Sequence, residues 1–278
     1  MSKATPTNEG TTMETITSAD GTEIAFERTG SGPPLVLVPG GGANDHTRWE
    51  AAGVRPALAE HCTVHAIDTR GLGQSGDADE YAFEREFEDV AAVIDSIDEP
   101  ATLLGHSSGA LLSMEAALRT DNLRAIILYE PPLSVADHEF DDAAALAEMD
   151  ELREQGQFEQ VLLTFLREVA EIPSDEIDAL RDAPNWHNRV DGAHTIPRYI
   201  RGVNGYEFDP ARFADLTVPT LLLSGSETQQ WVREATGVLH DTLPNSRLVT
   251  FEGHGHVAML TATERFLDEV LAFIREVD

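Results

Sequence analysis

The segment 101–119 constrains the fold of this chain most, because a short apolar run passes directly into a stretch rich in Ala and Leu. Between them, at 105–109, lies Gly-His-Ser-Ser-Gly, a G-x-S-x-G string. The apolar run predicts a buried strand and the Ala/Leu stretch a helix. Glycines two residues on either side of a serine let strand and helix pass closely, so we expect Ser107 at the apex of a sharp turn. Such strings also arise by chance, so the surrounding pattern must support this interpretation.

Short apolar runs and helical patterns alternate along much of the chain. Strands are predicted at 35–38, 64–67, 101–104, 124–129, 220–224 and 247–251, and helices at 81–97, 230–243 and 263–277. This alternation predicts right-handed crossovers and a mostly parallel, twisted α/β sheet flanked by helices. Two runs at 14–18 and 22–28 flank an Asp-Gly pair and predict an antiparallel hairpin at the sheet edge.

The pattern changes between 133 and 215, where 140–154 and 158–171 have helical spacing and no strand is predicted. We therefore expect a disordered tail at 1–12, a core made of 13–132 and 216–278, and an inserted helical cap at 133–215. No apolar run approaches the roughly 20 residues of a membrane span, and the first residues have no apolar leader. A cytoplasmic protein without membrane contact is expected.

The charge balance is unusual: 19 basic residues stand against 50 acidic ones, a formal net charge of −31, and Lys3 is the only lysine. Nucleic-acid binding is disfavoured. The acidic residues are spread along the chain, which predicts an acidic surface that salt must screen and hence a halophilic protein. An ordinary acidic cytosolic enzyme is the alternative. Cys62 is the only cysteine, which excludes an intramolecular disulfide and a cysteine-based metal site.

An exposed serine at such a turn suggests nucleophilic catalysis, which requires a histidine base, an acid that orients it and donors for an oxyanion. The glycines at 40–42 follow a buried strand, and the backbone N–H groups of Gly41 and Ser108 would form the oxyanion hole. A Glu-Gly-His-Gly-His segment follows the last strand. Within it, His256 is the best-placed base and His254 the second.

With these segments in this order, the chain resembles an α/β-hydrolase fold enzyme with an inserted cap. The resemblance rests on Pro-Gly-Gly at 39–41, Asp-Thr-Arg-Gly-Leu-Gly-Gln-Ser at 68–75, the string at 105–109 and Gly-His-Gly-His at 253–256. It implies Ser107 as nucleophile, Gly41 as oxyanion donor and His256 as base, with no metal or organic cofactor. One departure is Pro39-Gly40, which stands where the family commonly has His-Gly.

The acid is the second departure, because the position at which the family usually carries it falls on Thr228. Glu227 lies next to that position. Glu130 ends the predicted strand at 124–129, and Pro131-Pro132 stiffen the chain that follows. Some capped members, including the haloalkane dehalogenases, take their acid from that second place. We favour Glu130, with Glu227 as the alternative acid.

The sequence therefore predicts a serine hydrolase whose partner is a small acyl substrate: a carboxylic ester, lactone or thioester. A serine rather than an aspartate at position 107 disfavours dehalogenase and epoxide hydrolase chemistry. Two alternatives remain: a ligand-binding or sensing protein with vestigial turnover, and a cofactor-free lyase or peroxidase on the same scaffold. The substrate and the oligomeric state do not follow from the sequence.

Overall fold

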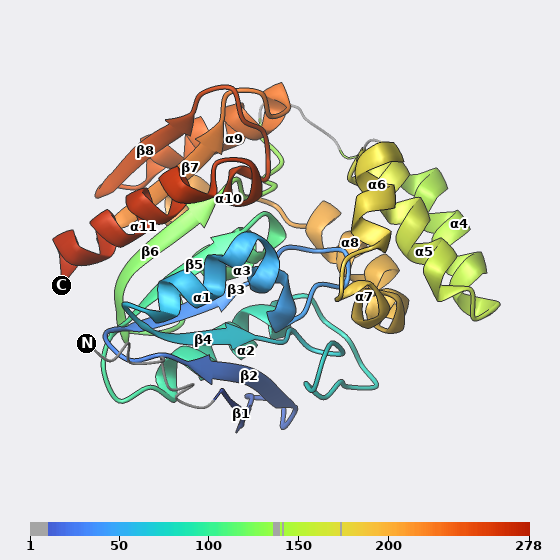
Figure 1. Cartoon of the computed structure of the whole chain (residues 1–278), viewed down its shortest axis with the longest axis horizontal. Coiled ribbons are helices and arrows are strands. Elements are labelled where there is room, and N and C mark those ends of the chain that lie inside the picture. Colours follow the sequence, from blue (N-terminus) through green and yellow to red (C-terminus); the bar gives the residue numbers. More distant parts are fainter. Residues whose placement is uncertain (1–10, 136–139, 141, 173) are drawn as a thin grey trace, which may run out of the picture.

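The computed structural model describes residues 11–135, 140, 142–172 and 174–278 (Figure 1). Its centre is one eight-stranded sheet in the order β1-β2-β4-β3-β5-β6-β7-β8. The strands are β1 (Thr12–Thr17), β2 (Glu23–Thr29), β3 (Pro34–Val38), β4 (Thr63–Ile67), β5 (Ala101–His106), β6 (Leu123–Tyr129), β7 (Thr220–Gly225) and β8 (Ser246–Phe251). β3 to β8 pair in parallel, whereas β2 pairs antiparallel with β1 and β4. The predicted fold class is confirmed.

The first two strands form the predicted antiparallel hairpin. Its turn contains Gly21, whose φ of 91° lies in the left-handed region that favours glycine. β1 already includes Thr12, which pairs with Arg28. The predicted tail at 1–12 is therefore too long by at least this residue, because main-chain pairing fixes Thr12 in the sheet. Residues 1–10 of that tail lie outside the described residues.

Side chains of β3 alternate between the two faces of the sheet, and all five of its residues are buried. Helices that cover these faces include α1 (Val54–Ala59), α2 (Glu84–Asp95), α3 (Ser108–Ala116), α9 (Gln230–Thr242) and α11 (Thr263–Val277). Leu35 and Leu37 pack in one cluster with residues of α1 and α11, and Val36 and Val38 in another with α2, α3 and α9. Burying each such side chain contributes about 1.5–3 kcal/mol, so an unbroken apolar run forms the central strand.

Between β6 and β7, the described residues form helices and turns but no strand. The longer helices are α4 (Ala143–Glu154), α5 (Phe158–Thr164), α6 (Ser174–Arg181), α7 (Trp186–Gly192) and α8 (Ile196–Asn204), which we call the cap. The apolar cluster of the cap also contains Ala43 and Leu72, which follow β3 and β4. The cap therefore packs on the carboxyl ends of these strands, as Figure 1 shows.

Some helices differ from the sequence-based expectation. The 3₁₀ helix η1 (His46–Gly53) and α1 join β3 to β4 where no helix was predicted. Gly53, with φ of 72°, separates these two short helices, so no long helical period marks the segment. Among the described helices, none has both the length and the apolar character that a membrane crossing requires.

Candidate active site

Ser107 lies between β5 and α3, in the strained turn at 105–109 that we call the elbow. Its φ of 56° is in the left-handed region, which is uncommon for a residue with a side chain. A Cβ on Gly105 would lie 2.4 Å from the Gly109 oxygen, and one on Gly109 would lie 2.4 Å from the Pro39 oxygen. Only glycine fits at both positions. The elbow is thus packed tightly against the loop that follows β3.

His256 lies in the loop that follows β8, and its ring meets the carboxylate at the end of β6. His256 Nδ1 lies 2.5 Å from Glu130 Oε2. A carboxylate only accepts hydrogen bonds, so when the imidazole is neutral its proton lies on Nδ1, which donates to Glu130. Nε2 of that ring is then unprotonated, which is the form that a general base requires.

Glu130 is completely buried, yet both of its carboxylate oxygens have donors. Oε1 accepts from the Ser224 hydroxyl at 3.0 Å and from the Gly225 N–H at 2.7 Å. Oε2 accepts from the Thr228 hydroxyl at 3.1 Å, in addition to His256. Glu130 also has a positive φ of 51°, a strained conformation that these bonds and its burial hold in place. The carboxylate is therefore fixed in one orientation toward the imidazole.

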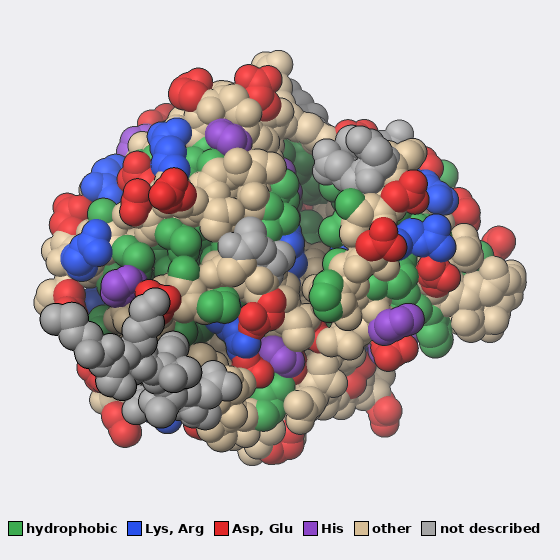
Figure 2. Space-filling view, viewed as in Figure 1, with side chains coloured by type: hydrophobic (Ala, Val, Ile, Leu, Met, Phe, Trp, Pro, Cys, Tyr) green, Lys and Arg blue, Asp and Glu red, His purple; other side chains and the backbone are tan. Residues whose placement is uncertain are grey.

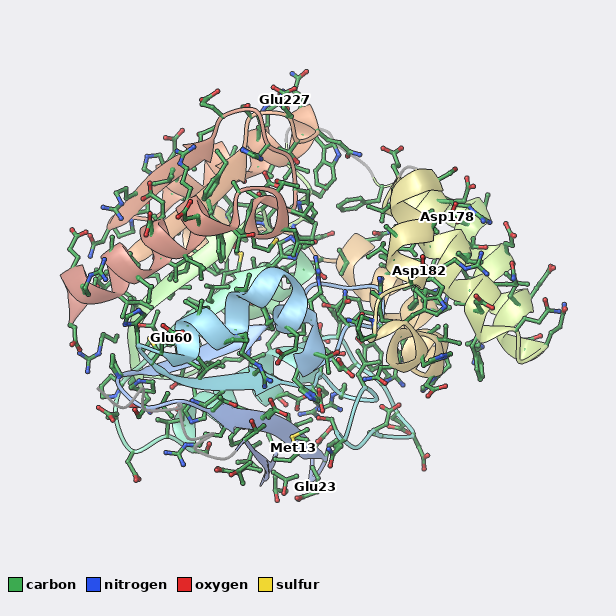
Figure 3. All side chains as sticks on the ribbon, in the orientation of Figure 1. Met13, Glu23, Glu60, Asp178, Asp182 and Glu227 are labelled. Atoms are coloured by element: carbon green, nitrogen blue, oxygen red, sulfur yellow. The ribbon has the colours of Figure 1, made fainter. Side chains whose placement is uncertain are left out.

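Glu227 lies elsewhere. Its side chain is exposed, and its hydrogen-bonding neighbour is the adjacent Ser226 hydroxyl, at 3.4 Å. Figure 3 places Glu227 at the outer edge of the molecule, on the loop that follows β7. Thr228, at the position where the family usually has its acid, donates instead to the carboxylate of Glu130. The structure thus brings Glu130 to His256 and leaves Glu227 facing outward.

The glycine loop at 40–42 lies directly beside the elbow. A Cβ on Gly40 would be 3.0 Å from Ser107 Cβ. The Gly41 N–H donates to the Ser108 hydroxyl at 2.7 Å, and Asn44 Nδ2 donates to the Gly41 carbonyl at 2.5 Å. Within the described residues, the Ser108 N–H has no acceptor. The sequence predicted both backbone donors, but not that the Ser108 side chain engages one of them.

Two further residues that sequence reasoning missed hold the loop that carries His256. The buried Tyr129 hydroxyl donates to the Gly255 carbonyl at 2.6 Å and accepts from the Ala258 N–H at 2.9 Å. His106 Nε2 donates to the His256 carbonyl at 2.8 Å, and burial lowers the pKa of His106 well below its usual value, so its ring is neutral. In the sequence, Tyr129 looks like the apolar end of a strand, so no pattern signals this role.

Asp68 follows β4 and braces the loop after it. Its Oδ2 accepts from the Gln74 N–H at 2.9 Å, and its Oδ1 accepts from the His46 N–H at 2.8 Å. Asp45, His46 and Asp68 form a cluster whose ligand atoms lie within 4.8 Å of one another. Hydrogen bonds within the protein use these carboxylates, so the cluster has an ordinary bracing role.

Comparison with known proteins adds family context to this geometry. A family model described as "Alpha/beta hydrolase family" matches residues 35–269. The chain is 27% identical over 275 residues to a 2-hydroxy-6-oxo-6-(2'-aminophenyl)hexa-2,4-dienoic acid hydrolase of Metapseudomonas resinovorans, covering 96% of this chain and 92% of that protein. It is 27% identical over 259 residues to a pimeloyl-[acyl-carrier protein] methyl ester esterase of Aeromonas hydrophila, covering 90% and 99%. The crystal structure of an alpha/beta hydrolase from Sphaerobacter thermophilus matches with a TM-score of 0.76 and 37% identity, covering 91% and 99%.

Proposed function

Because the chain belongs to the alpha/beta hydrolase family, we propose that it is a serine hydrolase that cleaves a small carboxylic ester, lactone or thioester. The observation that carries this proposal is the 2.5 Å contact between His256 Nδ1 and the buried Glu130 carboxylate, next to a strained elbow with a serine at its apex. Curated relatives named as a hydrolase and as a methyl ester esterase support the same reaction class.

In the proposed mechanism, Ser107 Oγ attacks the substrate carbonyl carbon while His256 Nε2 takes its proton. Glu130 holds the imidazole in the required tautomer and stabilises the imidazolium. The tetrahedral oxyanion accepts from the N–H groups of Gly41 and Ser108, and the substrate oxygen takes the place that the Ser108 hydroxyl occupies on Gly41.

The intermediate then collapses and expels the alcohol or thiol, which receives its proton from His256. A water molecule attacks the acyl-enzyme carbonyl and gives a proton to His256. When this second intermediate collapses, His256 returns the proton to Ser107 Oγ, and the carboxylic acid leaves. Cap residues select the substrate in this proposal. Tyr199 of α8 is one example, since a Cβ on Gly41 would lie 3.2 Å from its ring.

Labelling with a serine-reactive fluorophosphonate, combined with turnover of p-nitrophenyl esters of increasing acyl length, tests this proposal. We expect labelling of the wild type, none of Ser107→Ala, and turnover with a chain-length preference. Labelling of Ser107 without turnover would favour a ligand-binding protein. Turnover that persists in Ser107→Ala would overturn the serine mechanism.

A further inference from the structure

Arg189 is a buried cation beside the proposed oxyanion loop. It lies on α7, its side chain is 6% exposed, and its Nε donates to the Gly42 carbonyl at 3.1 Å. A Cβ on Gly42 would lie 3.0 Å from Arg189 Nη2, so the guanidinium packs against the residue next to Gly41. Neither terminal nitrogen of Arg189 bonds to a group in the described part of the chain. A buried charge whose terminal nitrogens have no hydrogen-bonded partner is costly, which calls for an explanation.

Arg48, on η1, is a second cation in the neighbourhood of Arg189. It is half-buried, and its side chain makes no hydrogen bond or ion pair with any described residue. Burial, together with the nearby charge of Arg48, lowers the pKa of Arg189 to about 10. The charge of Arg48 also adds to the effect of burial on the pKa of His106, within the elbow. Asp45 joins the two segments, because its carbonyl accepts from the Arg48 N–H at 3.0 Å and its Oδ2 accepts from Asn188 Nδ2, next to Arg189, at 2.9 Å. Arg48 therefore lies near Arg189.

Two neighbouring arginines without carboxylate partners are unexpected in a chain of net charge −31. Elsewhere in the described chain, buried or half-buried arginines form ion pairs with acids: Arg70 pairs with Asp89 and Arg198 with Asp77. Asp45 is close enough to influence Arg189, but its oxygens accept from the Thr47 N–H and from the Asn188 amide. Figure 2 shows basic side chains at the hollow between the cap and the sheet layers as well as on the outer surface, where acidic side chains are frequent.

We propose that Arg48 and Arg189 form a binding site for a carboxylate carried by the substrate, a few bonds from the scissile carbonyl. Guanidinium groups suit this ligand, because their planar forks bind carboxylates with two parallel hydrogen bonds. Gly42 links the site to Gly41, the proposed oxyanion donor. This inference rests on the proposed function and names its substrate class: half-esters of short dicarboxylic acids, which water converts into the dicarboxylic acid and an alcohol.

The test compares mono(4-nitrophenyl) glutarate and adipate with the neutral 4-nitrophenyl hexanoate and heptanoate, at one fixed KCl concentration. The measured quantity is the ratio of kcat/KM for the half-ester to that for its neutral partner, in the wild type, Arg48→Gln, Arg189→Gln and Arg167→Gln. Arg167 is an exposed arginine of the cap, so its substitution removes the same charge away from the site. Melting curves show whether each variant folds.

We expect the wild type to favour a half-ester by at least tenfold, although the net charge of the protein repels anions. Arg48→Gln and Arg189→Gln should each lower the ratio at least tenfold, while Arg167→Gln leaves it unchanged. If Arg189→Gln fails to fold, Arg48→Gln decides alone. A wild-type ratio near one, or equal ratios in Arg48→Gln and Arg167→Gln, would overturn the inference. Turnover of the neutral esters together with fluorophosphonate labelling separates this failure from failure of the hydrolase proposal itself.

Discussion

Glu130 illustrates how much at this site depends on single residues. The carboxylate is buried and receives four hydrogen bonds, and one of its donors stands where the family usually carries the acid. In the proposed triad, the acid lies at the end of β6, and Thr228 donates a hydrogen bond to it from the usual position. A carboxylate held in this way orients an imidazole without side-chain motion.

Substitution of the two candidate acids tests this assignment. We expect Glu130→Gln to lower kcat by roughly 10³–10⁴, because an amide favours the wrong tautomer of His256. Glu227→Gln should stay near wild type, because its side chain is exposed. Both are measured as kcat at fixed high salt, after circular dichroism shows that each variant folds. A large loss in Glu227→Gln with Glu130→Gln near wild type would assign the acid to Glu227.

Glu86 provides a pH-dependent prediction at the same scale. It is 2% exposed, its Oε2 has no partner among the described residues, and it borders a narrow cavity beside Gly41 and Tyr199. Burial, followed by the nearby charge of Asp89, raises the pKa of Glu86 to about 8 from 4.5. The folded protein thus favours the protonated form. The stability that Glu86 contributes is full below about pH 4.5 and is lost as the pH rises through about 8.

In the wild type, we therefore expect the free energy of unfolding to fall by up to about 1.4 kcal/mol per pH unit within that window. Glu86→Gln should abolish this fall. Urea unfolding at pH 5, 6, 7 and 8 in constant salt measures this slope. Glu84→Gln, on the exposed face of the same helix, is the control. A Glu86→Gln slope identical to that of the wild type would contradict the assignment.

At the scale of elements, the loop after β8 depends on its neighbours. The hydroxyl of Tyr129, at the end of β6, donates one hydrogen bond to that loop and accepts another from it. His106, at the end of β5, donates a hydrogen bond to the His256 carbonyl. The ends of two parallel strands thus position a loop that follows a third. This arrangement explains why the imidazole can be fixed by residues outside its own segment.

Tyr129→Phe tests this role. Loss of the hydroxyl leaves the Gly255 carbonyl and the Ala258 N–H without their partner, which should cost about 1–3 kcal/mol in the free energy of unfolding. We expect kcat to fall by about tenfold to a hundredfold, because a small displacement of His256 misaligns the base. Tyr206→Phe is the control, since its hydroxyl bonds to Glu115 away from this loop. Equal kcat values for the two variants would rule out the positioning role.

The strands were predictable from sequence because each is a continuous apolar run, and parallel strands buried on both faces require that pattern. The elbow and Glu130 were predictable because both stand where such a run ends. The donors to Glu130 were not, since Ser224 and Thr228 are ordinary polar residues whose contact depends on the pairing of β6 with β7. Likewise, the meeting of Arg48 with Arg189 depends on how the cap packs, and no local periodicity encodes it.

For the whole molecule, charge is the dominant feature. Figure 2 shows acidic side chains on both the cap and the sheet layers of the visible face. Two of the acidic residues of the cap, Asp178 and Asp182, are labelled near α6 in Figure 3. At low ionic strength, the acidic side chains that give the net charge of −31 repel one another. Folding stability should therefore depend on ionic strength.

We expect Tm to rise by on the order of 10 °C between dilute buffer and ~1 M KCl, where the Debye length is about 3 Å. Sucrose at matched osmolality is the control, because it stabilises proteins without screening charge. Differential scanning calorimetry measures the change. A Tm that does not move with KCl, or that moves equally with sucrose, would argue against dependence on high salt.

The most direct test of the account is the esterase activity of Ser107→Ala against that of Ser108→Ala, adjacent substitutions in the same elbow, measured with one p-nitrophenyl ester at fixed salt. We predict that Ser107→Ala loses at least about 10³ in kcat, because the nucleophile is gone. Ser108→Ala should remain within about tenfold of wild type, because alanine keeps the backbone N–H, and the side-chain bonds to Gly41 and Tyr199 that are lost take no part in the proposed mechanism. Equal losses in the two variants, or a greater loss in Ser108→Ala, would contradict Ser107 as the nucleophile.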